Sequence, residues 1–204
     1  MVDGLIGFCY NKSMKKYLFW FVALSLLGGC VFSSPKAPKT WNIEWGKTGV
    51  ERIEREKLPA VKLMLVDVRA PYNGARLAVL RSDGSIAFDS YNSFAAQPAA
   101  ILRGAAMDVM ESSTAFEAVV SGSSSASAPL AAEIMVSRLA LDCQTEGHRN
   151  ASVLLTIVLV GNRTVLSSAS AEASEPVEDG NYSAAFSRAF SRALLTAIGY
   201  IDLK

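Results

Sequence analysis

Apolar and polar residues alternate after residue 60 in a way that predicts a series of strands. Residues 61–68 are dominated by branched apolar side chains, which is typical of a central strand. Two shorter apolar runs, 76–81 and 86–91, flank the tetrapeptide Ser82-Asp83-Gly84-Ser85. Because glycine accepts the positive φ that a tight turn needs, an Asp-Gly pair between apolar runs predicts a β-hairpin.

Two segments place apolar residues at helical spacing instead. The first begins at Gln97-Pro98, where proline fits the first helical turn, and its apolar face continues to about Ser113. The second covers residues 182–201. Its large apolar residues recur at every fourth position, at Phe186, Phe190, Leu194 and Ile198. We interpret this stripe as core that packs on a sheet, with a groove-binding surface for a partner as the alternative.

Three long runs between the helices predict further strands, at residues 131–143, 152–160 and 163–173. The middle run is apolar at both odd and even positions, so both of its faces are expected to be buried. The pair Gly161-Asn162 is expected to join the last two strands as a tight hairpin. A short strand is also expected at residues 116–120, directly after the first helix.

The N-terminal part of the domain carries an aromatic pattern. Trp41, Ile43 and Trp45 alternate with polar residues and predict a first strand, although an exposed aromatic cluster near lipid headgroups would give the same pattern. The elements together predict one α/β domain of the α+β type over residues 41–204. Its sheet is expected to be mostly antiparallel, with two main helices packed on one face.

A different pattern precedes residue 30. Lys15 and Lys16 are followed by an apolar run, 17–27, and then by the tripeptide Gly28-Gly29-Cys30. A basic segment, a short apolar segment and a small-residue cleavage site are the parts of a secretory signal. The run is shorter than the roughly 20 apolar residues that a membrane span needs. A cysteine directly after Leu-Gly-Gly resembles the bacterial lipobox, in which the thiol is acylated.

The lipobox implies cleavage after Gly29 and a covalent lipid on Cys30. Residues 1–29 are therefore expected to form the signal peptide, and residues 30–40 a lipidated tether. We interpret residues 1–13 as an extension upstream of the true start. An uncleaved helical anchor that ends in cysteine is the alternative.

Localisation and charge narrow the range of partners. Lipidation would attach the chain to a membrane on the periplasmic side. Val31 stands where enteric inner-membrane lipoproteins carry aspartate, which favours the outer membrane over the inner one. Without residues 1–29, 17 basic and 18 acidic residues remain. This near-neutral balance, without a basic block, argues against nucleic acid as the main partner.

Residues for catalysis or metal binding are sparse. The chain has one histidine, His148, in a polar segment, and it lacks the patterns of a nucleophile elbow, a paired zinc ligand or a phosphate-binding loop. We interpret His148 as an exposed loop residue. Cys143 has no cysteine partner once Cys9 is removed and Cys30 is acylated, so we expect a small buried hydrophobe there. The sequence predicts no catalytic residue, no metal and no cofactor other than the lipid.

The order of these elements resembles the ABC-type transport auxiliary lipoproteins, a periplasmic family that includes the PqiC-like proteins. That family combines a lipobox, a short tether, an aromatic first strand, a hairpin with an Asp-Gly turn, and an aromatic-then-proline segment that opens a helix. The matching residues here are Cys30, 65–68, 80–84, Tyr91, Phe94, Pro98 and 116–119. Phe94 replaces the usual tryptophan of the family, and Leu80 replaces a frequent tyrosine.

The resemblance implies a non-enzymatic part of a lipid-transport system. In such systems an inner-membrane ABC transporter or permease works with an MCE-domain protein that bridges the periplasm, and the lipoprotein docks the far end at the outer membrane. These proteins are the implied partners, and self-association into a homo-oligomer is a further alternative. The hairpin at residues 76–91 is the expected docking surface, although an ordinary solvated hairpin would look the same. The candidate contacts are Arg76, Arg81, Asp83, Tyr91 and Phe94.

A second class of function fits the same features. Activators of peptidoglycan synthases and secretin pilotins also use small lipid-anchored α/β domains, so the fold alone does not separate them from a transport component. An envelope hydrolase is the third alternative, and it would depend on His148.

Overall fold

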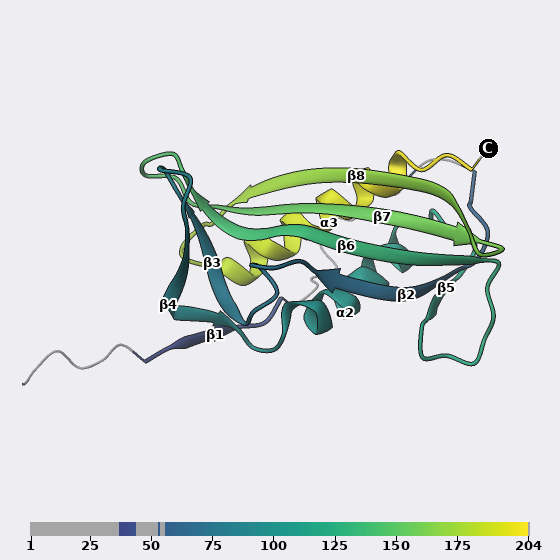
Figure 1. Ribbon diagram of the computed structural model, residues 1–204, viewed down its shortest axis with the longest axis horizontal. Helices are drawn as coiled ribbons and strands as arrows, with labels where there is room; N and C mark the ends of the chain where they lie inside the picture. The colour runs from purple at the N-terminus through teal and green to yellow at the C-terminus, as the bar shows by residue number, and fades with distance from the viewer. Residues whose placement is uncertain (1–36, 44–52, 54–55, 204) are drawn as a thin grey trace, which may run out of the picture. The chain divides into compact units, whose positions relative to one another are not determined.

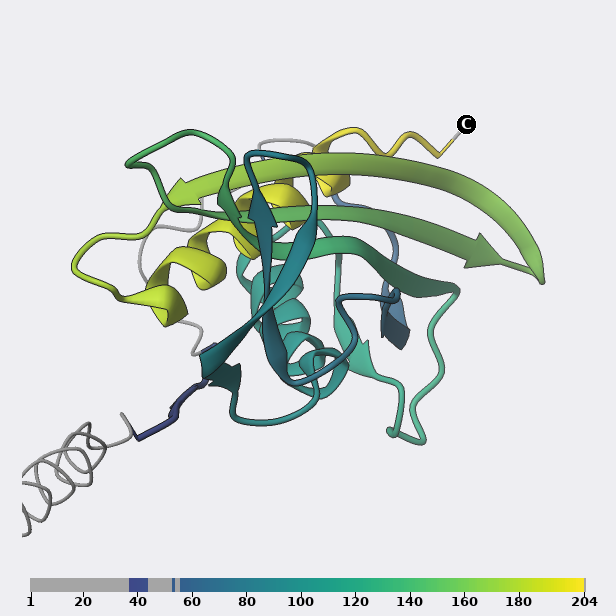
Figure 2. The ribbon, with the colours of Figure 1, turned by 60° about the vertical axis from the view of Figure 1, so that its left-hand side comes forward.

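The computed structural model describes residues 37–43, 53 and 56–203, and almost all of them belong to one compact unit, Pro38–Lys204. This unit contains an eight-stranded mixed sheet and, among the described residues, two long helices (Figures 1 and 2). The strands are β1 (Lys39–Trp41), β2 (Val61–Val68), β3 (Arg76–Arg81), β4 (Ile86–Phe94), β5 (Val119–Ser121), β6 (Leu130–Cys143), β7 (Asn150–Gly161) and β8 (Thr164–Pro176). The helices are α2 (Pro98–Ser112) and α3 (Tyr182–Gly199). The predicted α+β class is confirmed.

Strand β6 organises the sheet because it pairs along both of its edges. One edge pairs antiparallel with β7, from Ala131 to Asp142. The other edge pairs in parallel with β2 along its first half and with β3 near its end, from Ala140 onward. Strand β8 extends the sheet beyond β7, β5 lies beyond β2, and β4 and β1 lie beyond β3 (Figure 1). The longest ladders, β6–β7 and β7–β8, are antiparallel as expected.

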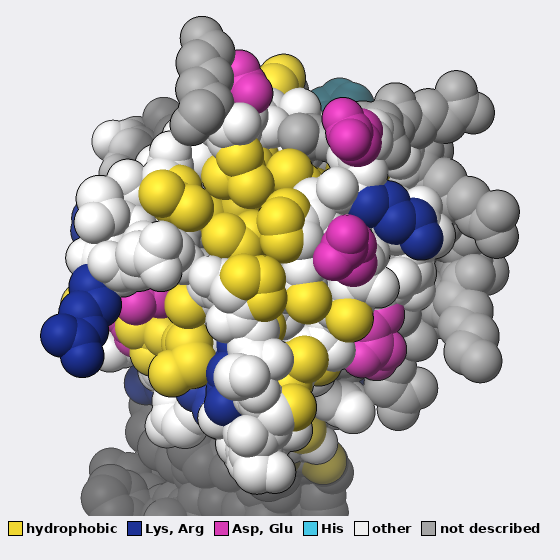
Figure 3. Space-filling view, turned by 90° about the vertical axis from the view of Figure 1, so that its right-hand side faces the viewer, with side chains coloured by type: hydrophobic (Ala, Val, Ile, Leu, Met, Phe, Trp, Pro, Cys, Tyr) yellow, Lys and Arg dark blue, Asp and Glu magenta, His cyan; other side chains and the backbone are white. Residues whose placement is uncertain are grey.

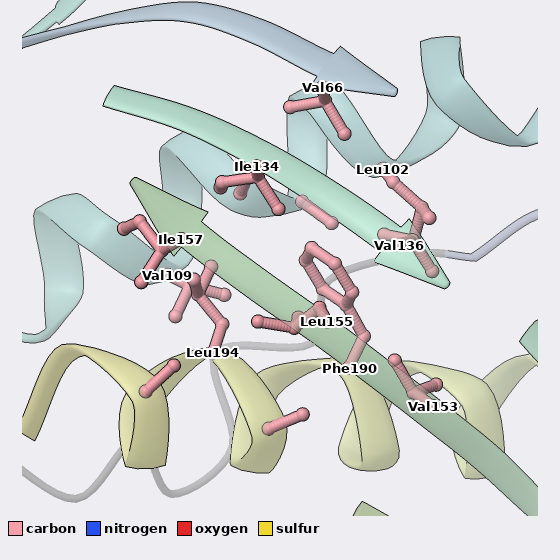
Figure 4. Packing of buried hydrophobic residues seen from close by; sticks show 14 of the residues in the cluster. Val66, Leu102, Val109, Ile134, Val136, Val153, Leu155, Ile157, Phe190 and Leu194 are labelled. Atoms are coloured by element: carbon pink, nitrogen blue, oxygen red, sulfur yellow. The ribbon is translucent and has the colours of Figure 1, made fainter. Parts of the chain in front are cut away.

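Both helices contribute to one hydrophobic core on one face of the sheet. Helix α2 lies against β2, and α3 lies against β7 and β8. Alternate residues of β7 point toward the helices and are fully buried: Val153, Leu155, Ile157 and Leu159. Figure 4 shows Phe190 and Leu194 of α3, together with Val109 of α2, meeting this row of side chains. The apolar stripe of α3 is therefore core, as the sequence predicts.

The opposite face of the sheet is more open and carries both polar and apolar side chains. On β7 the residues of the other parity from Leu154 onward, Leu154, Thr156, Val158 and Val160, are only half-buried, whereas Ser152 is buried. Thr156 and Ser170 share a hydrogen bond of 2.7 Å across this face, and Arg138 forms an ion pair with Glu172. The expectation that both faces of this strand are buried is therefore wrong, because none of the described elements covers the second face.

Several element boundaries differ from the sequence-based expectation. The turn between β7 and β8 consists of Asn162 and Arg163, with φ of 51° and 63°, because Gly161 still pairs with Thr164. A two-residue turn of this kind needs positive φ at both central residues. Strand β5 begins at Val119, three residues later than expected.

The first strand is also shorter than expected. Strand β1 ends at Trp41, and Ile43 is buried beyond its end. Trp45, the third residue of the predicted alternation, lies outside the described residues. The alternation of apolar residues therefore predicts the burial of Ile43 but not the extent of the strand.

Replacing Phe190 by alanine would remove a fully buried ring from the contact between α3 and β7. We expect Phe190→Ala to lower the free energy of unfolding by about 3–5 kcal/mol, as measured by chemical denaturation. The matched control is Ser168→Ala, at an exposed position of β8, with an expected change below about 0.5 kcal/mol. Equal losses in the two variants would contradict the central position of Phe190.

Candidate functional site

The residues of the expected lipidation site lie outside the described residues. This applies to Gly29, where cleavage is predicted, and to Cys30, where the lipid is predicted. Strand β1 is the first described element after them. The way in which β1 is held therefore determines how a tether would join the domain.

Strand β1 is attached to both the sheet and helix α3. It pairs in parallel with β4, with Lys39 opposite Asn92 and Trp41 opposite Phe94. The ring of Trp41 meets the ring of Tyr182 edge-on, with centroids 5.3 Å apart and an angle of 72°. The hydroxyl of Ser183 donates a hydrogen bond to the carbonyl oxygen of Asn42. A small apolar pocket at this junction is lined by Trp41, Ile43, Leu77, Ser93, Phe94, Tyr182, Ser183 and Phe186.

A chain of hydrogen bonds connects β1 to a bulge in β4. Trp41 Nε1 donates to Asn92 Oδ1 at 2.9 Å, and Asn92 Nδ2 donates to Asp89 Oδ2 at 2.8 Å. The other carboxylate oxygen of Asp89 accepts from the backbone N–H groups of Tyr91 and Asn92 at 2.7 and 3.0 Å. The register between β3 and β4 shifts in this region, and the carboxylate satisfies the N–H groups that the shift leaves without a strand partner.

The charge of Asp89 is stabilised by these bonds. Partial burial acts to raise the pKa of Asp89, but the hydrogen bonds from the Asn92 side chain and from the N–H groups of Tyr91 and Asn92 outweigh burial. Arg149, in the loop between β6 and β7, adds a smaller lowering. The pKa of Asp89 is therefore below its ordinary value, and the carboxylate stays ionised near neutral pH.

The expected docking residues do not form a single site. Arg76 lies at the start of β3, whereas Arg81 and Asp83 lie at its other end, roughly 17 Å away along the strand. All three are exposed, and Tyr91 is 54% exposed. At the turn, the hydroxyl and N–H of Ser85 bond to Asp83 and lower the pKa of its carboxyl group.

Phe94 is not a surface residue, and the expectation that it contacts a partner is wrong for this conformation. Its ring is buried, with 5% exposure, and meets the ring of Phe186 edge-on at 5.6 Å. The register shift in β4 explains this placement, because it changes which side chains of the strand face the core. Phe94 therefore secures the end of β4 against α3.

Exposed apolar residues are the feature that the sequence reading missed. Ile86 and Phe88 of β4 are 39% and 43% exposed. Val165 and Leu166 are also exposed, where β8 leaves the β7–β8 turn at one end of the domain (Figure 1). Figure 3 shows hydrophobic side chains gathered across that end, with charged residues around them. The alternating pattern of β4 places Ile86 and Phe88 on the same face of the strand, but the pattern alone does not tell whether another element covers that face.

Chemistry-bearing side chains remain dispersed in the part of the chain that the structure describes. No group of three or more His, Cys, Asp and Glu side chains is placed to hold a metal ion there. His148 is exposed in the loop between β6 and β7. Cys143 is half-buried and forms no disulfide within the described residues, and burial raises the pKa of its thiol. None of the described helices has the length and apolar character needed to cross a membrane.

Comparison with solved structures identifies the fold. The chain aligns with protein XCC0632 from Xanthomonas campestris, described under the family model DUF330, with a TM-score of 0.57 and 17% identity over 81% of this chain and 91% of that one. It also aligns with a crystal structure of an uncharacterized protein, with a TM-score of 0.55 and 11% identity over 78% and 95% of the two chains. No family model and no curated protein matches the sequence. The chain therefore shares the fold of the DUF330 structure.

Asp89 and Asn92 give a test of the β1 attachment. In Asp89→Asn, one amide N–H₂ would face the N–H₂ of Asn92, and turning Asn92 over would break its bond to Trp41. We expect a loss of unfolding free energy of about 1 kcal/mol at pH 7, because the site is partly open to solvent. Denaturation of Asp108→Asn, an exposed change on α2, is the control and should show no comparable loss.

The pH dependence of this difference follows from the lowered pKa of Asp89. The stabilisation is fully present above the unfolded pKa, near 3.8, and is lost as the pH falls through the lower folded value. The difference between wild type and Asp89→Asn should therefore shrink below about pH 4. A difference that stays constant down to pH 2 would contradict the role given to the ionised carboxylate.

Proposed function

We propose that this chain is an outer-membrane-anchored periplasmic lipoprotein that serves as a non-enzymatic docking component of an MCE-type or ABC-type lipid transport system. The observation that carries the proposal is the combination of a lipobox-like segment ending at Cys30 with a domain that shares the fold of a DUF330 structure. The resemblance to the ABC-type transport auxiliary lipoproteins supplies the transport role.

The attachment of β1 supports a tethered mode of action. The nine residues from Cys30 to Pro38 could span at most about 30 Å when fully extended. Strand β1 follows directly and is held by the sheet, by Tyr182 and by Ser183. A lipid on Cys30 would thus keep the domain close to the membrane surface, where it could receive the end of a periplasm-spanning partner.

A regulator of another envelope machine is the second candidate. A peptidoglycan synthase activator or a secretin pilotin would use the same anchor and the same kind of domain. The exposed hairpin β3–β4 suits either role, because exposed apolar side chains on a strand are common at protein interfaces. Identification of the partner separates the two candidates.

The anchor is tested by replacing its thiol. We expect Cys30→Ser to abolish incorporation of radiolabelled palmitate and to move the protein from the membrane fraction to the soluble periplasmic fraction, because serine offers no thiol for acylation. Cys143→Ser is the matched control and should keep both the label and the membrane location. Full labelling of Cys30→Ser would overturn the lipoprotein assignment.

The partner is tested by photo-crosslinking in cells. A photoreactive amino acid at Tyr91, which is 54% exposed on β4, should capture an MCE-domain protein. The same group at Glu111, exposed on α2, is the control and should not capture it. Capture of a synthase or a secretin, without any MCE-domain protein, would favour the second candidate.

A further inference from the structure

We propose that the outer edge of strand β8 binds an extended, acidic segment of a partner protein, which adds to the sheet as a further strand. The inference goes beyond the proposed function, because this edge is separate from the hairpin β3–β4. It also holds whether or not Cys30 carries a lipid.

The first observation is a long strand edge without a partner. Strand β8 has 13 residues, which corresponds to about 40 Å of backbone. One of its edges pairs with β7 from Asn150 to Gly161. In the described part of the chain, no strand pairs with the other edge. Alternate N–H and C=O groups of β8 therefore point away from the sheet, where another strand could meet them.

The second observation is that this edge lacks the usual protection. Proteins commonly protect an exposed edge with lysine, proline or a bulge. In β8 the bulge lies near Val165, at the start of the strand, and Pro176 lies at its end. Residues 167–174 between them consist of serine, alanine and one glutamate. That glutamate, Glu172, is engaged in an ion pair with Arg138. Short side chains leave the backbone groups accessible to an incoming strand.

The third observation gives the charge of the incoming segment. Glu175 of β8 is buried and faces two arginines of α3: Arg188 Nε lies 3.4 Å from Oε2, and Arg192 Nη1 lies 2.5 Å from Oε1. Arg188 Nη2 also donates to the carbonyl oxygen of Pro176 at 3.1 Å. One carboxylate thus meets two guanidinium groups at the C-terminal end of β8, and the Arg192 side chain is 66% exposed.

This surplus of positive charge favours an acidic ligand. Glu178 and Asp179 follow in the next loop, but neither forms an ion pair with these arginines in the described structure. A carboxylate on an added strand would reach the exposed guanidinium group of Arg192 and offset the surplus. Main-chain hydrogen bonds along β8 would supply affinity, and the carboxylate would fix the register.

A second copy of this chain complements the edge less well. In an antiparallel pairing of two β8 strands centred near Ser170, the C-terminal end of one strand meets the N-terminal end of the other. Arg163 of the turn directly precedes that end, so it would bring a further positive charge toward Arg188 and Arg192. An acidic segment from another protein would offset the positive charge of the two arginines, whereas a second copy of β8 would add to it.

The test uses synthetic peptides with the full chain purified in detergent. Two probes are eight-residue peptides of alternating valine and threonine, one with glutamate near its N-terminus and the other with glutamate near its C-terminus. Control peptides carry glutamine in place of glutamate, or a central proline that cannot pair along its length. Fluorescence anisotropy gives the affinities, and amide hydrogen exchange locates the binding.

We expect one glutamate peptide to bind and to slow exchange of amides in residues 167–174 by about tenfold or more. Arg192→Gln should lower the affinity for that peptide by about threefold to fivefold and leave the affinity for the glutamine peptide unchanged. Arg103→Gln on α2 should change neither affinity. The proline peptide should not bind. The proposal fails if β8 gains no protection at about 1 mM peptide. It also fails if affinity is independent of both glutamate and Arg192. Protection of β8 that rises with protein concentration alone would assign the edge to a second copy instead.

Discussion

The double pairing of β6 determines where the other elements lie. Its antiparallel edge is continuous with β7, but its other edge passes from β2 to β3 between Val136 and Ala140. The register shift in β6 falls at the same place, between Val136 and Arg138. The extra residue changes the parity of the strand, so Leu139 faces the core as Ile134 does. A single bulge therefore lets β6 keep its apolar side chains toward the core both where it pairs with β2 and where it pairs with β3.

The branch formed by β3, β4 and β1 depends on a second, polar irregularity. Asp89 accepts the N–H groups that the register shift in β4 leaves unpaired, and its bond to Asn92 orients the amide that holds Trp41. Trp41 in turn packs on Tyr182, the first residue of α3. A carboxylate in the middle of a strand would ordinarily weaken it. Here the carboxylate helps to orient Trp41, and it is the contact of Trp41 with Tyr182 that joins the N-terminal strand to the last helix.

Local patterns of the sequence predicted most elements, because periodicity and turn chemistry depend on near neighbours. The hairpin at Gly84, the start of α2 at Pro98 and the buried stripe of α3 all follow from such patterns. The order of strands does not, since the parallel pairing of β2 and β3 with β6 depends on contacts between distant residues. Phe94 shows the same limit within the candidate site. Its burial depends on a bulge that Asp89 stabilises, and a count of alternating residues does not include the bulge.

The edge strands of this sheet differ in length, and the stability of the fold does not require this difference. Strands β1 and β5 have three residues each, so they offer little template for pairing, whereas β8 offers 13. Ser168 and Ser174 on β8 are exposed, and lysine at such positions would change stability by only about 0.5 kcal/mol or less while protecting the edge. Packing of the core therefore does not explain why the outer edge of β8 carries mostly short side chains and no protecting lysine. Two arginines beside one buried carboxylate at its end give it a direction and a charge preference, which a purely structural edge does not need.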